Sequence, residues 1–402
     1  MTPEIKKRIE DIKAGIVPEG YKRAKHLGIY PKEWKVGKLE DVLYNVQRPV
    51  NKPTEPYWRL GVRSWAKGTF QSLVDDPSSV AMDELYKVRE NDLIVNITFA
   101  WEHAIAIAKK EDDGMLVSHR FPTYVFKLGN VPDYYQAVIS QPLFKKMLEN
   151  ISPGGAGRNR VLNRNDFLKL PCYILPTEEQ KRIADILSEH DKIISLCDKK
   201  LENLRLFKKA CLQKMFPKKG SNVPEIRFPG FTDPWEQRKF SDVVEIGSGM
   251  DYKHLGEGDI PVYGTGGYML SVDAALSEDK DAIGIGRKGT IDKPYILKAP
   301  FWTVDTLFYC IPKEKHDLDF TNCLFQNVDW KKKDESTGVP SLSKVIINNV
   351  ATAVPSFGEQ KKIGEYFKTI DNLITLHQRK CDLEREKKKA LMQLLLTGIV
   401  RT

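Results

Sequence analysis

The sequence predicts an α/β (α+β) protein in which two strand-rich globular domains alternate with two long helices as a pseudo-twofold repeat. The first observation behind this prediction is a long segment beginning at Leu175 that recurs in similar form from Val354. The second is that the chain before each copy is rich in β-branched and aromatic residues between polar loops, which is typical of strands. The third is the length of 402 residues, which suits two or three domains.

Composition and charge narrow the class of protein. Hydrophobic residues make up 41% and charged residues 29%, which excludes a wholly disordered chain. No apolar run approaches the ~20 residues of a membrane span, and the N-terminus lacks the apolar core of a signal peptide, so we expect a cytoplasmic protein. The net charge of +9 favours an anionic partner. None of the six cysteines forms a CxxC pair, which favours free thiols over a zinc site.

The chain is predicted to open with a helical arm, residues 1–30, before the first domain. A short amphipathic helix is expected over residues 2–14. Thr2 can cap it, Pro3 suits its first position and Gly15 can end it.

The two strand-rich domains are predicted over residues 31–175 and 218–354. They share faint similarities, such as Trp34 in the first domain and Trp235 in the second, each followed by an apolar residue and an Asp-Val pair. The polar linker at residues 217–224 contains Pro, Gly and Ser, which favours a boundary between the halves.

The two copies of the repeat are predicted as long helices over residues 176–217 and 355–402. Their register is constant at an offset of 359 − 179 = 180, because Glu179 and Gln180 match Glu359 and Gln360. Each copy follows a proline with a Thr or Ser in capping position and contains no internal proline. About 40 helical residues at 1.5 Å each correspond to a rod of roughly 60 Å.

The apolar positions of both helices follow a heptad pattern, which favours pairing of the two helices with each other. Polar residues such as Lys208 and Lys388 occupy some of the core positions, where they can specify register at a cost in stability. Two unrelated surface helices are the alternative. The residues predicted to pair the helices are Ile183, Leu187, Ile194, Leu201, Leu204, Ile363, Phe367, Ile370, Ile374 and Leu391.

Sequence signatures of catalysis are missing. There is no GxxxxGK[ST] nucleotide loop, no HExxH and no GxSxG. The tetrapeptide Asp292-Lys-Pro-Tyr295 is the nearest approach to the [DNS]PP[YF] motif of amino-methyltransferases, and it lacks one proline. We therefore expect neither a catalytic centre nor a metal site in this chain.

Several loops combine glycine with Arg, Lys, Asn, Ser and Thr, the residue types that contact DNA phosphates and base edges. The densest loop runs over residues 152–165, and a second lies around Trp58 and Trp65. Solvated turns are the alternative for each loop. The candidate DNA-binding residues are Arg59, Arg63, Lys67, Arg158, Asn159, Arg160, Asn163, Arg164, Thr265, Arg287, Lys288, Lys331, Ser336, Thr337, Ser341 and Lys344.

The paired motif P-x(2,3)-EQ-K-[RK]-I resembles that of the specificity subunits of type I restriction-modification enzymes. Pro176, Glu179 and Gln180 carry the resemblance in the first copy, and Pro355, Glu359 and Gln360 carry it in the second. The segment Val223-Pro-Glu-Ile-Arg-Phe-Pro-Gly-Phe231 supports it, and the resemblance covers essentially the whole chain. The first half departs from the second because its arm lacks that segment.

The resemblance implies two target-recognition domains, each binding half of a bipartite, asymmetric DNA site. It implies that the two helices pack antiparallel as a spacer. It also implies double-stranded DNA, two modification subunits and optional restriction subunits as partners, with S-adenosylmethionine on the modification subunits and no catalytic centre or cofactor in this chain. The alternatives are a coiled-coil scaffold that binds proteins, or a fused methyltransferase or nuclease polypeptide.

Overall fold

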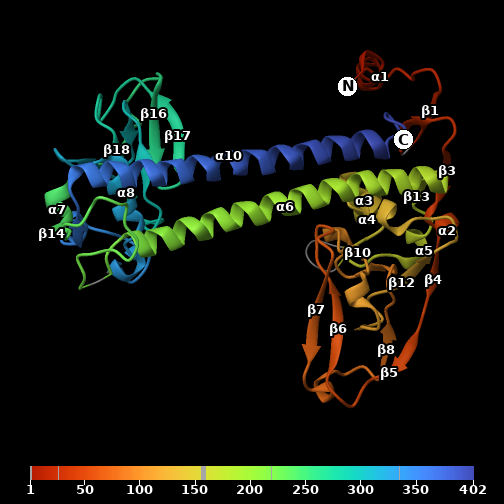
Figure 1. Ribbon diagram of the computed structural model, residues 1–402. Coiled ribbons are helices and arrows are strands. Elements are labelled where there is room, and N and C mark those ends of the chain that lie inside the picture. Colours follow the sequence, from red (N-terminus) through yellow and green to blue (C-terminus); the bar gives the residue numbers. More distant parts are fainter. Residues whose placement is uncertain (1, 26, 155–159, 219, 335) are drawn as a thin grey trace. The chain divides into compact units, whose positions relative to one another are not determined.

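The computed structural model describes residues 2–25, 27–154, 160–218, 220–334 and 336–402. The chain forms two compact units, each with its own sheets and hydrophobic core (Figure 1). Unit 1 comprises Met1–Ser195 and Asp382–Thr402, and unit 2 comprises Leu196–Cys381. No helix within the described ranges is long and apolar enough to cross a membrane.

Unit 1 contains two main sheets. An antiparallel sheet has the order β10-β9-β12-β4, and a mixed sheet has the order β5-β8-β11-β6-β7, in which β11 pairs parallel with β6. The strands of these sheets are β4 (Leu43–Val46), β5 (Pro49–Asn51), β6 (Tyr57–Val62), β7 (Thr69–Val74), β8 (Glu84–Lys87), β9 (Leu93–Val95), β10 (Ile105–Ile107), β11 (Leu116–Val117) and β12 (Thr123–Phe126).

The remaining elements of unit 1 lie before, between and after these strands. Two strand pairs, β1 with β2 and β13 with β3, stand apart from the main sheets. The elements are α1 (Pro3–Lys13), β1 (Tyr21–Ala24), β2 (Gly28–Pro31), β3 (Lys35–Lys38), α2 (Leu39–Val42), η1 (Pro77–Ser79), η2 (Ala100–Glu102), η3 (Lys110–Asp112), α3 (Pro132–Ile139), α4 (Pro142–Asn150), α5 (Arg164–Phe167) and β13 (Pro171–Ile174).

Unit 2 has a four-stranded antiparallel sheet, β15-β21-β18-β19, and a three-stranded sheet, β17-β16-β20, in which β20 pairs parallel with β16. A further pair joins β14 to β22. The elements are β14 (Glu236–Lys239), α7 (Phe240–Val243), β15 (Val244–Ser248), β16 (Ile260–Gly264), β17 (Gly267–Val272), β18 (Ala282–Gly286), β19 (Tyr295–Leu297), β20 (Trp302–Thr303), β21 (Leu307–Pro312), α8 (Leu318–Gln326), η4 (Trp330–Lys333), α9 (Lys344–Asn348) and β22 (Ala351–Val354).

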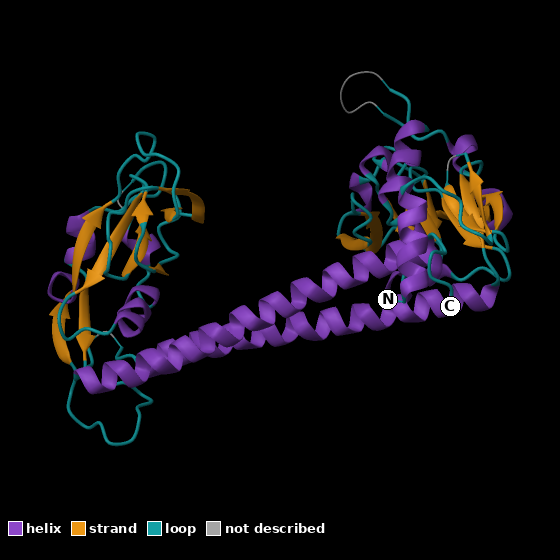
Figure 2. Cartoon of the chain, turned by 90° about the horizontal axis from the view of Figure 1, so that it is seen from above, coloured by secondary structure: helices purple, strands orange, loops and turns teal. Residues whose placement is uncertain are grey.

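The two units repeat one topology. The strand order β4-β12-β9-β10 in unit 1 corresponds to β15-β21-β18-β19 in unit 2, and each unit has a hairpin whose first strand pairs parallel with a later strand. The predicted α/β fold class with a duplicated, strand-rich domain is therefore confirmed. Unit 1 adds β5 and β8 at one end of its mixed sheet, and Figure 2 shows the strands of each unit beside the helices of the same unit.

The long helices are α6 (Thr177–Met215) and α10 (Phe357–Leu396). In unit 1, residues near the start of α6 share a core with Leu395 at the end of α10. In unit 2, Met215 at the end of α6 shares a core with Phe367 near the start of α10. Within each unit the two helix segments therefore run antiparallel. The helix predicted to reach residue 402 ends at Leu396, because Gly398 adopts a φ of +70°.

Ion pairs across the helix pair repeat with the same offset as the sequence. In unit 1 the Lys388 ammonium binds the Asp191 carboxylate, 2.5 Å away, and in unit 2 Lys208 binds Asp371 at 2.6 Å. Both lysines occupy core positions of the heptad pattern. The polar interruptions noted in the sequence are therefore paired with an acid from the opposite helix.

The Glu-Gln pair at the start of each long helix anchors that helix to its own unit. The Gln180 amide oxygen accepts the Val131 N–H (2.9 Å) ahead of α3, and the amide nitrogen donates to Leu175 O. The Gln360 amide oxygen accepts the Asp317 N–H (3.1 Å) ahead of α8 in the same way. The motif thus joins each helix to the segment that follows the sheet.

The preceding glutamates are almost completely buried and paired with arginine. Arg401 binds Glu179 in unit 1, where the Trp34 indole N–H also donates to that carboxylate at 3.0 Å. Arg227 binds both oxygens of Glu359 in unit 2, at 2.7 Å each. Each arginine lies just after the C-terminal end of one long helix, and its glutamate lies at the start of the other. Each ion pair therefore connects the two helices of one unit.

The N-terminal arm packs against the C-terminal tail. Helix α1 begins after Thr2, whose hydroxyl accepts the Ile5 N–H, as predicted. The Arg8 guanidinium donates to Ile399 O at 2.6 Å, and the Tyr21 hydroxyl donates to Gly398 O at 2.7 Å. The arm therefore helps to position the tail that carries Arg401.

Capping of the two long helices differs from the expectation at one position. The Ser356 hydroxyl accepts the Glu359 N–H at 3.5 Å, whereas the Thr177 hydroxyl donates to Gly129 O at 2.7 Å. Thr177 is itself the first residue of α6, so its side chain connects the helix to the preceding turn instead.

Candidate nucleic-acid interface

Four of the predicted DNA-binding residues of unit 2 line one cleft of about 410 Å³. We call it the β18 cleft, and its lining residues are Ser248, Arg287, Lys288, Phe308, Ser341, Leu342, Ser343 and Lys344. These residues come from separate parts of the sequence, so only folding brings them together.

Local backbone structure explains how these parts meet. Strand β18 ends at Gly286, where a Cβ atom would lie 2.1 Å from the Thr290 carbonyl oxygen, so only glycine fits. Beyond it, Arg287 O accepts the Leu342 N–H at 2.9 Å, and Lys288 forms a β-bridge with Ser341. The loop before α9 is thereby attached to the end of a fully buried strand.

The cations of the β18 cleft are partly engaged with the protein. The Lys344 ammonium donates to Ile246 O (2.9 Å) and lies 6.0 Å from the centre of the Phe308 ring. The Arg287 guanidinium lies 5.8 Å from the same ring, and its side chain and that of Lys288 are exposed. Phe308 therefore supports two cations that can still bind a phosphate or a base edge.

Unit 1 has a smaller cleft of about 30 Å³ at the corresponding place. We call it the β4 cleft, and its lining residues are Asn45, Val46, Gln47, Tyr86, His119, Phe121, Pro122, Thr123 and Arg164. The Leu162 N–H donates to Ile97 O at 2.8 Å, as Leu342 does to Arg287 O in unit 2. Arg164 and Lys344 thus occupy equivalent positions, and the Arg164 guanidinium donates to His119 O.

The two clefts present different functional groups. The β4 cleft offers the amides of Asn45 and Gln47 together with a histidine, and a hydrogen bond to Glu84 raises the pKa of its Tyr86 hydroxyl. The β18 cleft instead offers serine hydroxyls and three cations. Two sites with equivalent positions but different donors and acceptors can distinguish two different base sequences.

A second group of residues in unit 1, which includes the predicted Arg63, Lys67 and Arg160, lies at the β6–β7 turn and the 3₁₀ helix η2. We call it the η2 cluster: Arg63, Trp65, Lys67, Trp101, Lys145 and Arg160. The Arg160 guanidinium donates to Glu149 O (2.9 Å) and Ser152 O (3.1 Å) at the end of α4 and lies 5.5 Å from the Trp101 ring. Arg160 therefore caps α4, a structural role that was not foreseen. Arg59 is exposed on the neighbouring strand β6.

The other predicted residues lie elsewhere. The Lys331 ammonium binds Asp292 at 2.9 Å, a hydrogen bond that lowers the pKa of that carboxyl group. The backbone N–H groups of Ser336 and Ser341 both donate to Asp334. The Asn163 side chain caps α5. Thr265 lies in the β16–β17 turn, and Thr337 is exposed. Arg158 and Asn159 lie outside the described residues.

Sequence reasoning found half of the residues that line the β18 cleft but only Arg164 in the β4 cleft. Asn45, Gln47 and His119 lie in strand or loop segments with no cluster of basic residues, and Phe308 lies within strand β21. Gln47 stands at the position of Ser248 when β4 is matched to β15, but neither residue was a candidate, so alignment of the two halves would not have found this pair.

No group of three or more possible metal ligands occurs among the residues that the structure describes. Five cysteines are buried and Cys211 is half-buried. Burial raises the pKa of the Cys172 thiol to about 12. Burial also raises the pKa of the Cys310 and Cys323 thiols, so these three cysteines pack in the two cores as neutral groups.

The ten predicted helix-pairing residues are buried or half-buried. Ile183 and Leu187 belong to the core of unit 1, and Ile363, Phe367 and Ile370 belong to that of unit 2. Leu391 and Ile374 pack at the edges of these two cores.

The duplicated domain and the paired helices define a class of DNA specificity proteins, and comparison with known families agrees. A family model described as the type I restriction modification DNA specificity domain matches residues 31–206 and again residues 232–385. The chain therefore belongs to this family and contains two copies of its domain.

Two curated relatives come from Methanocaldococcus jannaschii. The type I restriction enzyme MjaVIII specificity subunit is 29% identical over 285 residues, which cover 60% of this chain and 64% of the relative. The putative type I restriction enzyme MjaX specificity subunit is 24% identical over 95% of this chain and 97% of its own length. The chain thus spans somewhat less than two thirds of the first relative and nearly all of the second.

Solved structures show the same fold at low sequence identity. The S subunit of the type I restriction-modification system from M. genitalium superposes with a TM-score of 0.59 at 15% identity, covering 95% of this chain and 99% of that one. A chain from a structure on complex assembly and conformational transition of the type I R-M system also gives 0.59, at 13% identity, covering 92% and 99%.

Proposed function

We propose that this chain is the DNA sequence-specificity subunit of a type I restriction-modification complex and that each unit recognises one half of a bipartite, asymmetric site. The observation that carries the proposal is the pair of equivalent clefts with different chemistry. Equivalent positions suit two half-sites on one duplex, and different side chains suit half-sites of different sequence. The chain itself would supply no catalysis.

The long helices would set the distance between the half-sites. Each runs without interruption from residues of one unit into residues of the other, since α6 spans Thr177–Met215 and the division falls after Ser195. Because a helix rises about 1.5 Å per residue, its length converts directly into spacing. Inserting one turn into both helices is expected to lengthen the unrecognised spacer and leave both half-sites unchanged.

The central test is single-molecule methylome sequencing of the host with and without this gene. We expect a bipartite methylated motif that disappears on deletion. Substituting Arg287→Ala together with Lys288→Ala should alter or weaken recognition of one half-site only, whereas Lys253→Ala, an exposed lysine outside the cleft, should change nothing. A methylome that deletion leaves intact would contradict the proposal.

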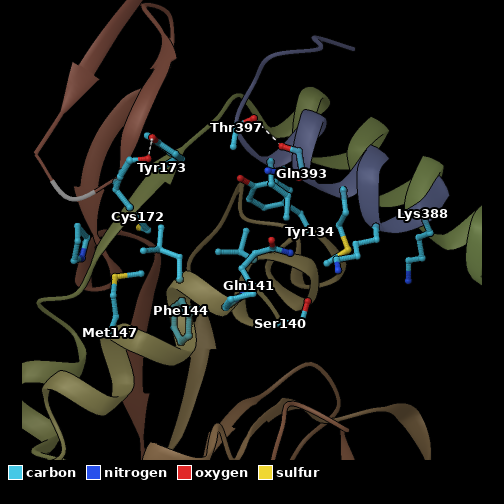
Figure 3. Close-up of a pocket in the computed structure, with 18 of the residues that line it drawn as sticks. Tyr134, Ser140, Gln141, Phe144, Met147, Cys172, Tyr173, Lys388, Gln393 and Thr397 are labelled. Carbon is cyan, nitrogen blue, oxygen red and sulfur yellow. Dashed lines mark hydrogen bonds between the residues drawn. The ribbon is translucent and has the colours of Figure 1, made fainter. Parts of the chain in front are cut away.

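Attachment of partner subunits is expected at two partly corresponding grooves, one in each unit. Groove 1, in unit 1, has a volume of about 770 Å³ and lies between α3, α4, β13 and the end of α10 (Figure 3). Apolar side chains such as Phe144, Met147 and Met392 line it, with Lys388 and Lys389 at one side. Groove 2, in unit 2, has a volume of about 240 Å³.

The two grooves correspond in part. Phe216 and Thr352 in groove 2 stand at the positions of Leu396 and Cys172 in groove 1, with the offset of 180 that relates the two helices. Groove 2 is more polar than groove 1, since Lys218, Ser221 and Asn327 line it. Two corresponding surfaces suit two copies of one partner. We propose that each groove receives one modification subunit, which would carry S-adenosylmethionine, and that restriction subunits join through them.

Stoichiometry tests this attachment. Leu143→Arg in groove 1 is expected to reduce the complex from two modification subunits to one in native mass spectrometry. Leu128→Arg is the matched control, because Leu128 is fully exposed in the same unit and lies outside the groove. Retention of both modification subunits by the Leu143→Arg variant would exclude groove 1 as the attachment site.

A further inference from the structure

The turn between β6 and β7 holds two consecutive residues in a conformation that side chains rarely adopt. Trp65 has a φ of 64° and Ala66 a φ of 50°, in the left-handed region that favours glycine and asparagine. A bulky aromatic residue in this region persists only where its surroundings hold it there.

The surroundings of the turn do hold it. The Trp65 N–H donates to Glu102 O at 2.9 Å, and the Ala66 N–H donates to His103 O at 2.8 Å. The Ser64 hydroxyl donates to the Glu102 carboxylate at 2.7 Å. His103 is buried, and its ring hydrogen-bonds to Ile139 O at 2.6 Å. The backbone of the turn is therefore fixed on η2, and η2 is fixed on the core.

The indole of Trp65 does not enter that core. Its side chain is 61% exposed, although a tryptophan gains more from burial than most other residues. Arg63 and Lys67, on either side of it in the turn, are also exposed, and the Lys145 ammonium lies 4.5 Å from the ring centre. The Arg63 guanidinium itself lies over the Phe70 ring. A rigid, exposed aromatic ring with one cation against it and others nearby in the turn is the combination with which proteins stack on nucleic-acid bases.

Unit 2 also has an exposed aromatic residue at the corresponding hairpin. Tyr268, at the start of β17, is 63% exposed beside the β16–β17 turn that contains Thr265. The hairpin β16–β17 corresponds to β6–β7, since each pairs through its first strand with a parallel neighbour. An exposed aromatic ring therefore occurs at the same hairpin of both domains.

We propose that Trp65 is a base-stacking residue, whose ring inserts at a base step within or beside the half-site bound by unit 1. This inference rests on the proposed function and assigns a further contact to the same DNA site. Arg63 and Lys67 bind the flanking phosphates, and the preformed turn presents the ring without ordering a loop on binding. The inserted ring unstacks one base step. Because base steps differ in how easily they unstack, the affinity then depends on the sequence of that step.

The test uses the full-length chain assembled with its modification subunits and the bipartite duplex that its methylome defines. 2-Aminopurine is placed at successive positions of the unit 1 half-site, because its fluorescence rises when a base unstacks. Trp65→Asn removes the ring but suits the left-handed backbone, and Trp65→Phe keeps a smaller ring. Leu73→Ala is the matched control, since Leu73 is 46% exposed on the same hairpin outside the turn.

The wild-type complex is expected to give a fluorescence rise at one position, which Trp65→Phe and Leu73→Ala retain and Trp65→Asn loses. Affinity of Trp65→Asn should fall by roughly 5- to 100-fold, with an unchanged salt dependence because no cation is removed. If Trp65→Asn binds and unstacks the duplex as the wild type does, the inference is wrong while the proposed function stands. If Trp65→Asn instead loses a modification subunit, the ring contacts protein and the inference is also wrong. If the wild-type complex binds no duplex sequence-specifically, both the inference and the proposed function are wrong.

Discussion

The buried ion pair between Arg227 and Glu359 is expected to be among the strongest single contacts of unit 2. The guanidinium donates to both carboxylate oxygens at 2.7 Å, and the two side chains are only 13% and 1% exposed. The hydrogen bond to Glu359 raises the pKa of Arg227, which is the direction expected for a stabilised cation. A third hydrogen bond, to Asp233 O at 2.7 Å, lies within the linker before β14, so Arg227 attaches this linker to the start of α10.

Arg227→Met keeps most of the volume and leaves the carboxylate buried without its partner. Breaking a buried pair in this way costs about 3–5 kcal/mol. Unit 2 has 381 − 196 + 1 = 186 residues, and for that size each kcal/mol lowers Tm by roughly 2–4 °C, so a fall of about 6–20 °C follows. The Tm of unit 2 can be followed by calorimetry, with hydrogen exchange of the β18 amides as a local measure.

Two comparison variants make the result specific. Arg238→Met removes an exposed pair with Glu236 and should cost less than about 1 kcal/mol. Arg401→Met removes the equivalent pair of unit 1, and the loss should be smaller than for Arg227, because Arg401 is 36% exposed and Trp34 still donates to Glu179. Equal losses for Arg227→Met and Arg238→Met would refute the reasoning that burial makes this pair strong.

Three further outcomes are expected. Lys208→Asp should destabilise the helix pair of unit 2 by about 1–3 kcal/mol in urea unfolding, and adding Asp371→Lys should restore part of that loss. If the losses of the two single variants simply add in the double variant, the two residues do not pair. Burial lowers the pKa of His103 below the ~6.5 of an unfolded histidine. Unit 1 should therefore have its full stability above about pH 6.5 and lose stability as the pH falls below that value. His103→Gln should flatten this dependence in unfolding experiments run from about pH 7.5 to 5.5. Replacing Arg287 and Lys288 by alanine should reduce the slope of log K against log salt by about 1 for each phosphate that the variant no longer binds, and an unchanged slope would mean that neither residue binds phosphate.

Much of the fold could be predicted because it depends on periodic or repeated features. The heptad of apolar residues and the constant offset between Glu179 and Glu359 specify two long helices that belong to one repeat. Thr2, Pro3 and Gly15 mark a short helix by local chemistry, and α1 begins and ends where they indicate. Such features depend on neighbours in the sequence, so no tertiary information is needed.

The candidate site was only half predictable, because its members lie far apart in the chain. Arg287 and Lys344 were recognisable by residue type, whereas Phe308 gained its place in the β18 cleft only through the pairing of β18 with β21. Arg160 was expected to contact DNA, yet the structure directs its guanidinium to the carbonyl groups at the end of α4. Residue type alone does not separate a cation that caps a helix from one that faces solvent.

The sequence by itself determined the duplication and the two long helices, since both are properties of spacing along the chain, and the residues of its paired motif carry the resemblance to the family. Tertiary structure decided which carboxylate each charge meets and which side chains share a cleft. Lys388 finds Asp191, and Arg401 finds Glu179, only because the helix segments within unit 1 run antiparallel. The physical reason is that ion pairing and hydrogen bonding act over a few ångströms, so they depend on distances that are set only once the cores have packed.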